Sequence, residues 1–143
     1  MSVLDTLLAN PGLYTGTGTE HDGTVSVARI MVTALPNKAS VAIDYEARHA
    51  GNPNQWVEHA ILGRFFGGGL VLITSCPPDE SLCVLCPHAD DEGFFVNDPA
   101  ESKFPAGIRV ECETSGRLRY DWWYSMPGKP LERHDDTTVH LVK

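Results

Sequence analysis

The chain has 143 residues, 42% of them hydrophobic, with 13 glycines, 10 prolines and a net charge of −8 from 11 basic and 19 acidic side chains. This length fits one domain, and this apolar content excludes a disordered chain or a coiled coil. The acidic balance, without a basic stripe, argues against nucleic acid or a membrane surface as partners. No apolar run approaches the ~20 residues of a membrane span.

The first predicted element is a short helix over residues 1–11. Ser2 and Asp5 form an S-x-x-D capping box at its start, its leucines share one face, and Asn10-Pro11-Gly12 ends it. Because a helix this short is not stable alone, we expect it to cover an apolar opening as a lid. The start also lacks the basic and apolar segments of a signal peptide, which predicts a cytoplasmic protein with reduced cysteines.

From residue 12 to residue 143 the apolar period changes to 2, and clusters of Gly, Pro, Asn and Asp interrupt it at even spacing. This pattern predicts an antiparallel meander of strands joined by tight turns. The expected strands lie near 13–20, 24–35, 39–49, 55–66, 70–76, 82–87, 93–96, 107–114, 117–126 and 137–142.

Three of these runs alternate cleanly enough to assign their faces. The apolar face comprises Val41, Ile43, Tyr45, Ala47, Ile108, Val110, Cys112, Leu118, Tyr120, Trp122, Tyr124 and Met126. The polar face comprises Asp44, Glu46, Arg48, Arg109, Glu111, Glu113, Arg117, Arg119, Asp121 and Ser125. Closing the sheet buries the apolar face and removes both edges. We therefore predict an all-β protein, a single up-and-down β-barrel of about ten strands over 12–143 preceded by the helix; a β-sandwich is the alternative.

Barrels of this size enclose either packed side chains or one small ligand. Large inward aromatic residues beside small ones suit a pocket for a small, largely apolar molecule. The residues expected to line it are Tyr45, Trp56, Phe66, Leu72, Tyr120, Trp122 and Tyr124. The alternative is a filled barrel that serves as a protein-interaction module, with an exposed Trp123 as its contact surface. An incompletely closed barrel edge would favour a homodimer.

Residues 12–18, Gly12-Leu13-Tyr14-Thr15-Gly16-Thr17-Gly18, resemble the G-x-W-x-G-x-G opening of the calycin-like (lipocalin and nitrobindin-like) barrels, with Tyr14 in place of Trp. The segments EHAILGRFF, GGGLVLITS and the histidine-bearing C-terminus are similar to later strands of the nitrobindin-like group. This resemblance implies haem as a cofactor, His140 as the ligand of its iron from inside the barrel, and chemistry on reactive nitrogen species. His59 is a second inward candidate. Alternation leaves open whether His140 or its neighbours Val139 and Leu141 point inward.

Other chemistry has weaker support. Cys76, Cys83, Cys86 and His88 offer four soft ligands for zinc, but residues three apart on a strand point to opposite faces, which favours ordinary thiols. The sequence contains no nucleophile elbow, phosphate-binding loop or H-E-x-x-H motif, and glycines 67–69 predict a hairpin turn. The sequence leaves open whether the protein is an enzyme.

Overall fold

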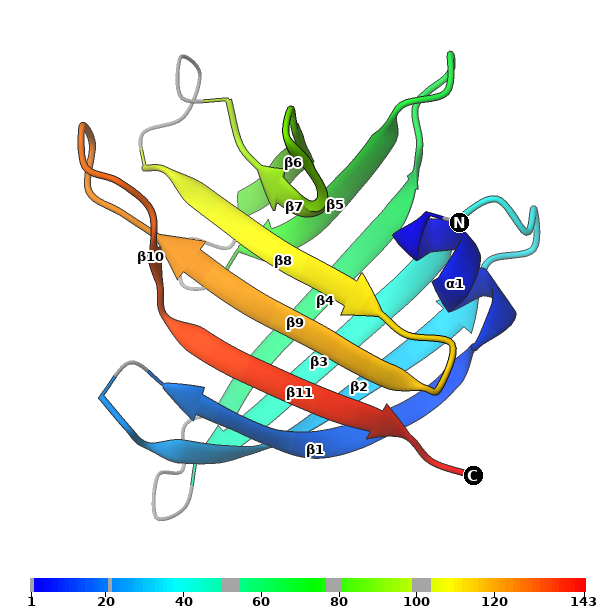
Figure 1. The fold of residues 1–143 in the computed structure, drawn as a ribbon, viewed down its shortest axis with the longest axis horizontal. Helices are drawn as coiled ribbons and strands as arrows, with labels where there is room; N and C mark the ends of the chain where they lie inside the picture. Colours follow the sequence, from blue (N-terminus) through cyan, green and yellow to red (C-terminus); the bar gives the residue numbers. More distant parts are fainter. Residues whose placement is uncertain (1, 21, 50–54, 77–80, 99–103) are drawn as a thin grey trace.

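The computed structural model describes residues 2–20, 22–49, 55–76, 81–98 and 104–143 (Figure 1). These residues form one short helix and eleven strands. In chain order they are α1 (Val3–Ala9), β1 (Gly12–Glu20), β2 (Val25–Ala34), β3 (Val41–His49), β4 (Gln55–Arg64), β5 (Leu70–Cys76), β6 (Ser81–His88), β7 (Asp91–Val96), β8 (Ala106–Cys112), β9 (Arg117–Tyr124), β10 (Glu132–Arg133) and β11 (Asp135–Leu141).

The strands form one antiparallel sheet that closes on itself. Their order is β10-β9-β11-β1-β2-β3-β4-β5-β6-β7-β8, and β8 pairs back with β9. The short β10 pairs with the end of β9 at Trp123 and Tyr124, and β11 pairs with the start of β9 at 117–119. These two strands therefore share one edge of β9, and the ring is a closed barrel of ten strands with one short helix. The predicted all-β barrel is confirmed, and the sandwich is excluded.

Burial alternates along the strands as a barrel requires. On β3, Val41, Ile43, Tyr45 and Ala47 are buried, and the intervening charged residues are not. On β8 and β9 the predicted inward residues are likewise buried or half-buried, except for Met126, which lies beyond β9 and is 63% exposed. That expectation was wrong because the strand ends at Tyr124, and side chains beyond it no longer follow its alternation.

Asp121 is a second departure from the predicted faces. It occupies the outward side of β9, as expected, yet it is fully buried. Its Oδ1 accepts the backbone N–H of Thr137 at 2.9 Å, and its Oδ2 lies 2.6 Å from Nε of Arg119. Nearby, Asp135 Oδ1 accepts the backbone N–H of Trp122 at 2.7 Å. Beyond the residues at which β9 and β11 pair through their backbones, the carboxyl groups of Asp121 and Asp135 thus join the two strands by accepting backbone N–H groups.

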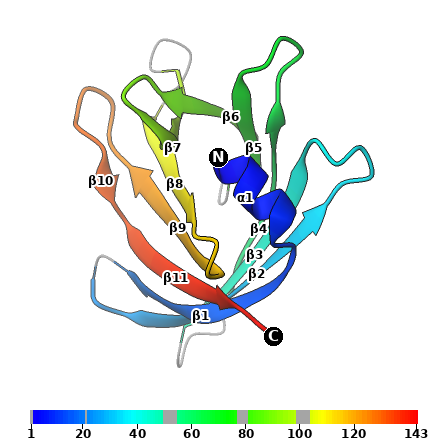
Figure 2. The ribbon, with the colours of Figure 1, turned by 45° about the vertical axis from the view of Figure 1, so that its right-hand side comes forward.

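Helix α1 covers one end of the barrel (Figure 2). Leu4 and Leu7 are buried in the core, and Ser2 and Asp5 form the predicted capping box. The buried Tyr14 on β1 donates its hydroxyl to the carbonyl of Asn10 at 2.6 Å, which ties the helix to the first strand. The expected lid is confirmed. The opposite end of the barrel, where β3, β5 and β9 end, is called the far end.

The predicted hairpin turn at glycines 67–69 is confirmed by two backbone bonds, from the Phe65 N–H to Gly69 and from the Gly68 N–H to Phe65. The segments 51–54 and 77–80, which contain turn-forming residues between the expected strands, lie outside the described residues. No helix in the described part of the chain has both the length and the apolar character needed to cross a membrane.

Candidate ligand-binding site

The structure brings most of the predicted lining residues together inside the barrel. Tyr45, Leu72, Tyr120 and Trp122 are buried, and Trp56 and Tyr124 are half-buried and pack against the core. The prediction for Phe66 was wrong, because β4 ends at Arg64 and Phe66 lies fully exposed in the turn that follows it.

Aromatic side chains cross the interior between opposite walls. The rings of Tyr45 on β3 and Tyr120 on β9 lie 5.5 Å apart, and Trp56 on β4 meets Trp122 on β9 edge to face at 6.1 Å. Towards the far end, Tyr124 stacks on Trp122 at 5.2 Å with the two rings nearly parallel. We call Trp56, Trp122 and Tyr124 the aromatic wall. Because Trp56 and Tyr124 are only half-buried, its outer part remains accessible.

A buried carboxyl group holds this wall in place. Glu58 on β4 is completely buried. Its Oε1 accepts the indole N–H of Trp122 at 2.6 Å and that of Trp56 at 3.4 Å. Its Oε2 accepts the hydroxyls of Tyr120 at 2.6 Å and Thr74 at 2.5 Å. A carboxylate offers about four lone-pair sites, so these four donors satisfy it fully.

Sequence reasoning did not identify Glu58. The available signal was its alternation with Trp56, Ala60 and Leu62, which places it on their face of β4. The opposite face of this strand carries Val57 and Ile61, so neither face of β4 is purely polar.

The electrostatics of the interior follow from its burial. Removal from water raises the pKa of Glu58, and the hydrogen bonds from Thr74, Tyr120 and the two indoles oppose that rise. Burial raises the pKa of Asp135 to about 8, and the nearby Glu20, Asp121 and Glu58 add to the effect. Both groups are therefore harder to ionise than exposed carboxyls.

Five arginines point away from this site, whereas two histidines lie at the far end of the barrel. His49 shares the inward side of β3 with Tyr45 and lies 3.6 Å from Glu20, and the ring of His134 meets Tyr124 edge to face at 5.0 Å. Arg29, Arg48, Arg109, Arg117 and Arg119 occupy outward positions that alternate with buried residues on β2, β3, β8 and β9. The far half of the interior therefore contains acidic and aromatic groups without an arginine from these four strands.

Neither histidine proposed for haem faces the interior. His140 is exposed on β11, and its neighbour Val139, which pairs with Gly16 and Leu118, is the buried residue. His59 is also exposed, and its Nδ1 lies 2.7 Å from Oδ1 of Asp44 on the outer face of β3. The prediction that His140 ligates haem iron from inside was wrong about its orientation, because the register of β11 turns Val139 inward. The residues do not fit that haem site.

The cysteines considered as zinc ligands do not form a metal site within the described residues, and Trp123 is not an exposed contact residue. Cys83 packs against the core and Cys86 is exposed, as expected for residues three apart on a strand. Within the described residues no group of three metal-ligating side chains comes together, and the side chain of Cys76 lies outside them. Trp123 was expected to be an exposed contact residue, but it is half-buried and meets the ring of Phe94 edge to face at 5.5 Å.

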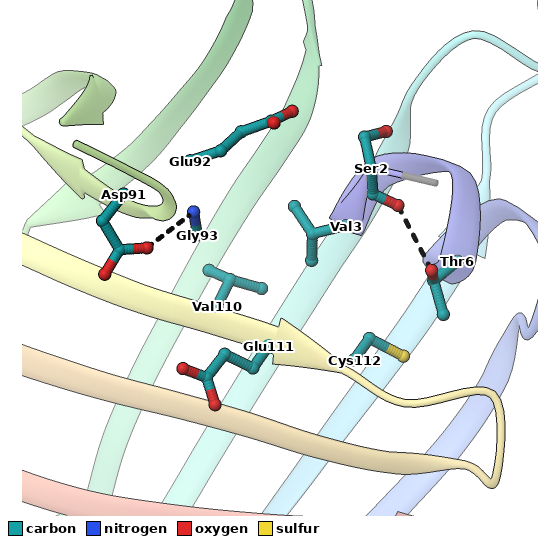
Figure 3. Close-up of a pocket in the computed structure, with 9 residues that line it drawn as sticks. All are labelled: Ser2, Val3, Thr6, Asp91, Glu92, Gly93, Val110, Glu111 and Cys112. Atoms are coloured by element: carbon teal, nitrogen blue, oxygen red, sulfur yellow. Dashed lines mark hydrogen bonds between the residues drawn. The ribbon is translucent and has the colours of Figure 1, made fainter. Parts of the chain in front are cut away.

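A separate pocket lies between α1 and strands β7 and β8 (Figure 3). Its volume is about 320 Å³, and Ser2, Val3, Thr6, Asp91, Glu92, Gly93, Val110, Glu111 and Cys112 line it. Arg109 pairs with Asp91 at 2.8 Å and with Glu111 at 3.3 Å, so these two acids already have a cation. Burial raises the pKa of the Cys112 thiol, which disfavours a reactive thiolate. The pocket thus has no evident catalytic chemistry.

Comparison with known proteins shows similarity in fold but not in family. No family model matches the chain, and no curated protein matches it. Six solved chains do match. One of them, in the structure of EF1p2_mFAP2b bound to DFHBI, has a TM-score of 0.54 and 12% sequence identity, over 99% of this chain and 99% of that chain. The likeness is one of fold. The calycin-like resemblance at the family level remains a prediction.

Proposed function

We propose that this protein binds a small, largely apolar ligand at the far end of its barrel, against the aromatic wall. The observation that carries the proposal is the combination of fixed orientation and access. Glu58 holds both indoles by their N–H groups, yet Trp56 and Tyr124 remain half-buried. Ligand sites typically combine apolar aromatic surface with a few placed polar groups in this way.

The fold comparison supports the proposal. A solved structure with the same barrel fold is bound to DFHBI. The aromatic side chains that cross the interior between β3–β4 and β9 limit the site to the half beyond them. The ligand would therefore contact Tyr124 and the outer part of the Trp56 indole, which are the half-buried members of the wall.

The direct test uses the neutral fluorescent probe N-phenyl-1-naphthylamine together with solvent extraction and mass spectrometry of the purified protein. We expect saturable probe binding that weakens by about tenfold in Tyr124→Ala, since a buried aromatic side chain contributes roughly 1.5–3 kcal/mol. The control is Phe66→Ala, which removes a fully exposed ring at the other end of the barrel. Absence of both probe binding and a co-purifying molecule would favour the filled barrel.

Self-association is a second candidate function, favoured by an apolar outer face on β4–β6. Val57, Ile61, Leu82 and Val84 are 41–74% exposed there, and Ile61, Ile73 and Val84 lie in register across the three strands. The outward-facing residues of these strands, at 57, 59, 61, 63, 71, 73, 75, 82, 84 and 86, include no Asp, Glu, Lys or Arg. Two copies, each with a net charge of −8, would repel one another across their charged surfaces. We therefore propose that a second copy packs on this uncharged apolar face.

Sedimentation analysis tests this contact. We expect a dimer that dissociates in Val84→Lys and persists in the control Thr19→Lys, which places the same charge on the exposed outer side of β1. A wild-type monomer at high protein concentration would exclude the proposed dimer.

A further inference from the structure

We infer that the ligand at the aromatic wall is an organic cation, a protonated or quaternary amine that carries an apolar body. This inference rests on the proposed function, because it assigns the chemical class of the ligand to the same site. It follows from the charges around the wall, from the hydrogen bonds of Glu58 and from the ring faces that remain accessible.

The charge distribution disfavours an anionic ligand. Glu58 and Asp135 both lie near the wall, since one binds the indole of Trp122 and the other its backbone N–H. The arginines of β2, β3, β8 and β9 point outward and supply no counter-charge. The basic side chains near the wall are His134, against the ring of Tyr124, and His49, which already lies beside Glu20. A carboxylate ligand would thus be buried beside acidic groups without an arginine partner from these strands, whereas a cation would favour the ionised state of these carboxyl groups and so meet complementary charge.

The hydrogen bonds of Glu58 determine how a cation would be recognised. Its oxygens already accept four bonds, from the two indoles, Tyr120 and Thr74, so no lone pair is left for a ligand N–H. Glu58 therefore orients the rings, and it contributes negative charge when a nearby cation favours its ionised form. Accepting the N–H groups of Trp56 and Trp122 also polarises these indoles, which makes their faces more negative.

The contacts to the ligand then come from ring faces. A cation within about 6 Å of an aromatic centroid is attracted by the ring quadrupole, most strongly for Trp. Trp56 and Tyr124 pack on the buried Trp122 at 6.1 Å and 5.2 Å, and these two half-buried rings are the aromatic surfaces of the wall that a ligand can reach. Sites built from several aromatic rings are those that bind alkylated ammonium groups.

Binding of a cation should also release protons. The titratable groups nearest Glu58 are Tyr45 from β3, Tyr120 from β9 and Asp135 from β11, all with raised pKa values. Glu20 on β1 and His49 on β3, which pair at 3.6 Å, and His134, against Tyr124, lie at the same end of the barrel. A nearby cation favours the ionised carboxylates. The network can satisfy either state of Glu58, because the Thr74 hydroxyl lies 3.1 Å from the Ser75 carbonyl and can donate there while accepting a proton from Glu58.

The experiment is calorimetric titration of the full chain with three probes that share a naphthalene ring. They are (1-naphthylmethyl)trimethylammonium, neutral 1-naphthylmethanol and anionic 1-naphthylacetate. The quaternary probe cannot titrate, so proton release, measured in two buffers of different ionisation enthalpy, belongs to the protein. We expect the cation to bind about tenfold tighter than the neutral probe, the anion to bind most weakly, and cation affinity to rise with pH.

Glu58→Gln tests the source of the preference, because the amide oxygen can still accept the indole N–H groups. We expect the ratio of cation to neutral affinity to fall towards one, while the control Glu111→Gln on the outer face of β8 keeps the wild-type ratio. If the Glu58→Gln protein does not fold, the three-probe comparison on the wild type still decides the question. Equal or tighter binding of the neutral or anionic probe overturns the inference and leaves the proposed function standing. Failure of all three probes and of N-phenyl-1-naphthylamine overturns the proposed function itself.

Discussion

Truncation of Glu58 should reveal how much the buried carboxyl group contributes to the fold. In Glu58→Ala the hydroxyl of Tyr120 and the indole N–H of Trp122 lose their acceptor, and both side chains are almost completely buried. The Thr74 hydroxyl keeps the Ser75 carbonyl as a partner, and the half-buried Trp56 can reach water. Two of the four donors, the Tyr120 hydroxyl and the Trp122 indole N–H, are therefore left without an acceptor.

Each buried donor left without an acceptor costs roughly 1–3 kcal/mol. The Tyr120 hydroxyl loses its acceptor in both variants, because the amide NH2 of Glu58→Gln only donates, so Glu58→Ala should lose about 1–3 kcal/mol of unfolding free energy relative to Glu58→Gln, from the Trp122 indole. Gln is the matched reference because it retains an acceptor for the indoles and nearly the same volume. This difference is a large part of the roughly 5–15 kcal/mol that stabilises a typical domain.

Urea denaturation at pH 7, followed by tryptophan fluorescence and circular dichroism, measures the difference between the two variants. The dependence of the free energy on urea should remain that of the wild type, since the surface exposed on unfolding hardly changes. A Glu58→Ala protein within about 0.5 kcal/mol of Glu58→Gln would refute the reasoning, because it would mean that the buried indole N–H of Trp122 finds another partner.

Three further predictions concern pH, barrel closure and the lid. The pKa of Asp135 is raised from 3.8 to about 8 in the folded protein, so its contribution to stability is greatest below about pH 4 and falls as the pH rises to 8; urea titrations across this range should show a smaller fall in Asp135→Asn. A Cβ at Gly16 would lie 2.3 Å from the Thr138 carbonyl, so Gly16→Ala should lower stability by about 1–3 kcal/mol, and Thr17→Ala on the exposed side of β1 should not, as thermal melts would show. Ser2→Ala removes the capping oxygen of α1 and should cost about 1 kcal/mol by denaturant titration, whereas no change would mean that the cap is redundant.

Much of the fold could be predicted because turn-forming residues mark both ends of each short strand in the sequence. Each of the ten expected runs corresponds to a strand of the barrel, and the helix begins at the predicted capping box. The errors lie at strand ends. Phe66 and Met126 were assigned to an interior face, but β4 and β9 end before them. Where pairing stops is decided by neighbouring strands and turns, which a single run does not encode.

The candidate site could be predicted only in part. The aromatic residues of β9 were recognisable, since their alternation with charged residues is clean. Glu58 was not, because β4 presents Val57 and Ile61 on one face and Trp56 and Glu58 on the other. Asp121 faces outward, as the alternation of β9 predicts, but it is buried there by its contacts with Arg119 and Thr137, which the sequence of β9 alone does not indicate.

The amino-acid sequence by itself determined where strands form and which residues share a side, because alternation with a period of 2 is a local property of an extended chain. It did not determine which side faces the axis when both carry apolar residues. Closure of the ring made that choice: the pairing of Val139 with Gly16 and Leu118 turned His140 to the surface. Pairing of β4 with β3 and β5 likewise directed Glu58 into the barrel. A shift of one residue reverses every side chain of a strand, so only the assembled sheet places a carboxyl group, instead of an imidazole, among the aromatic rings.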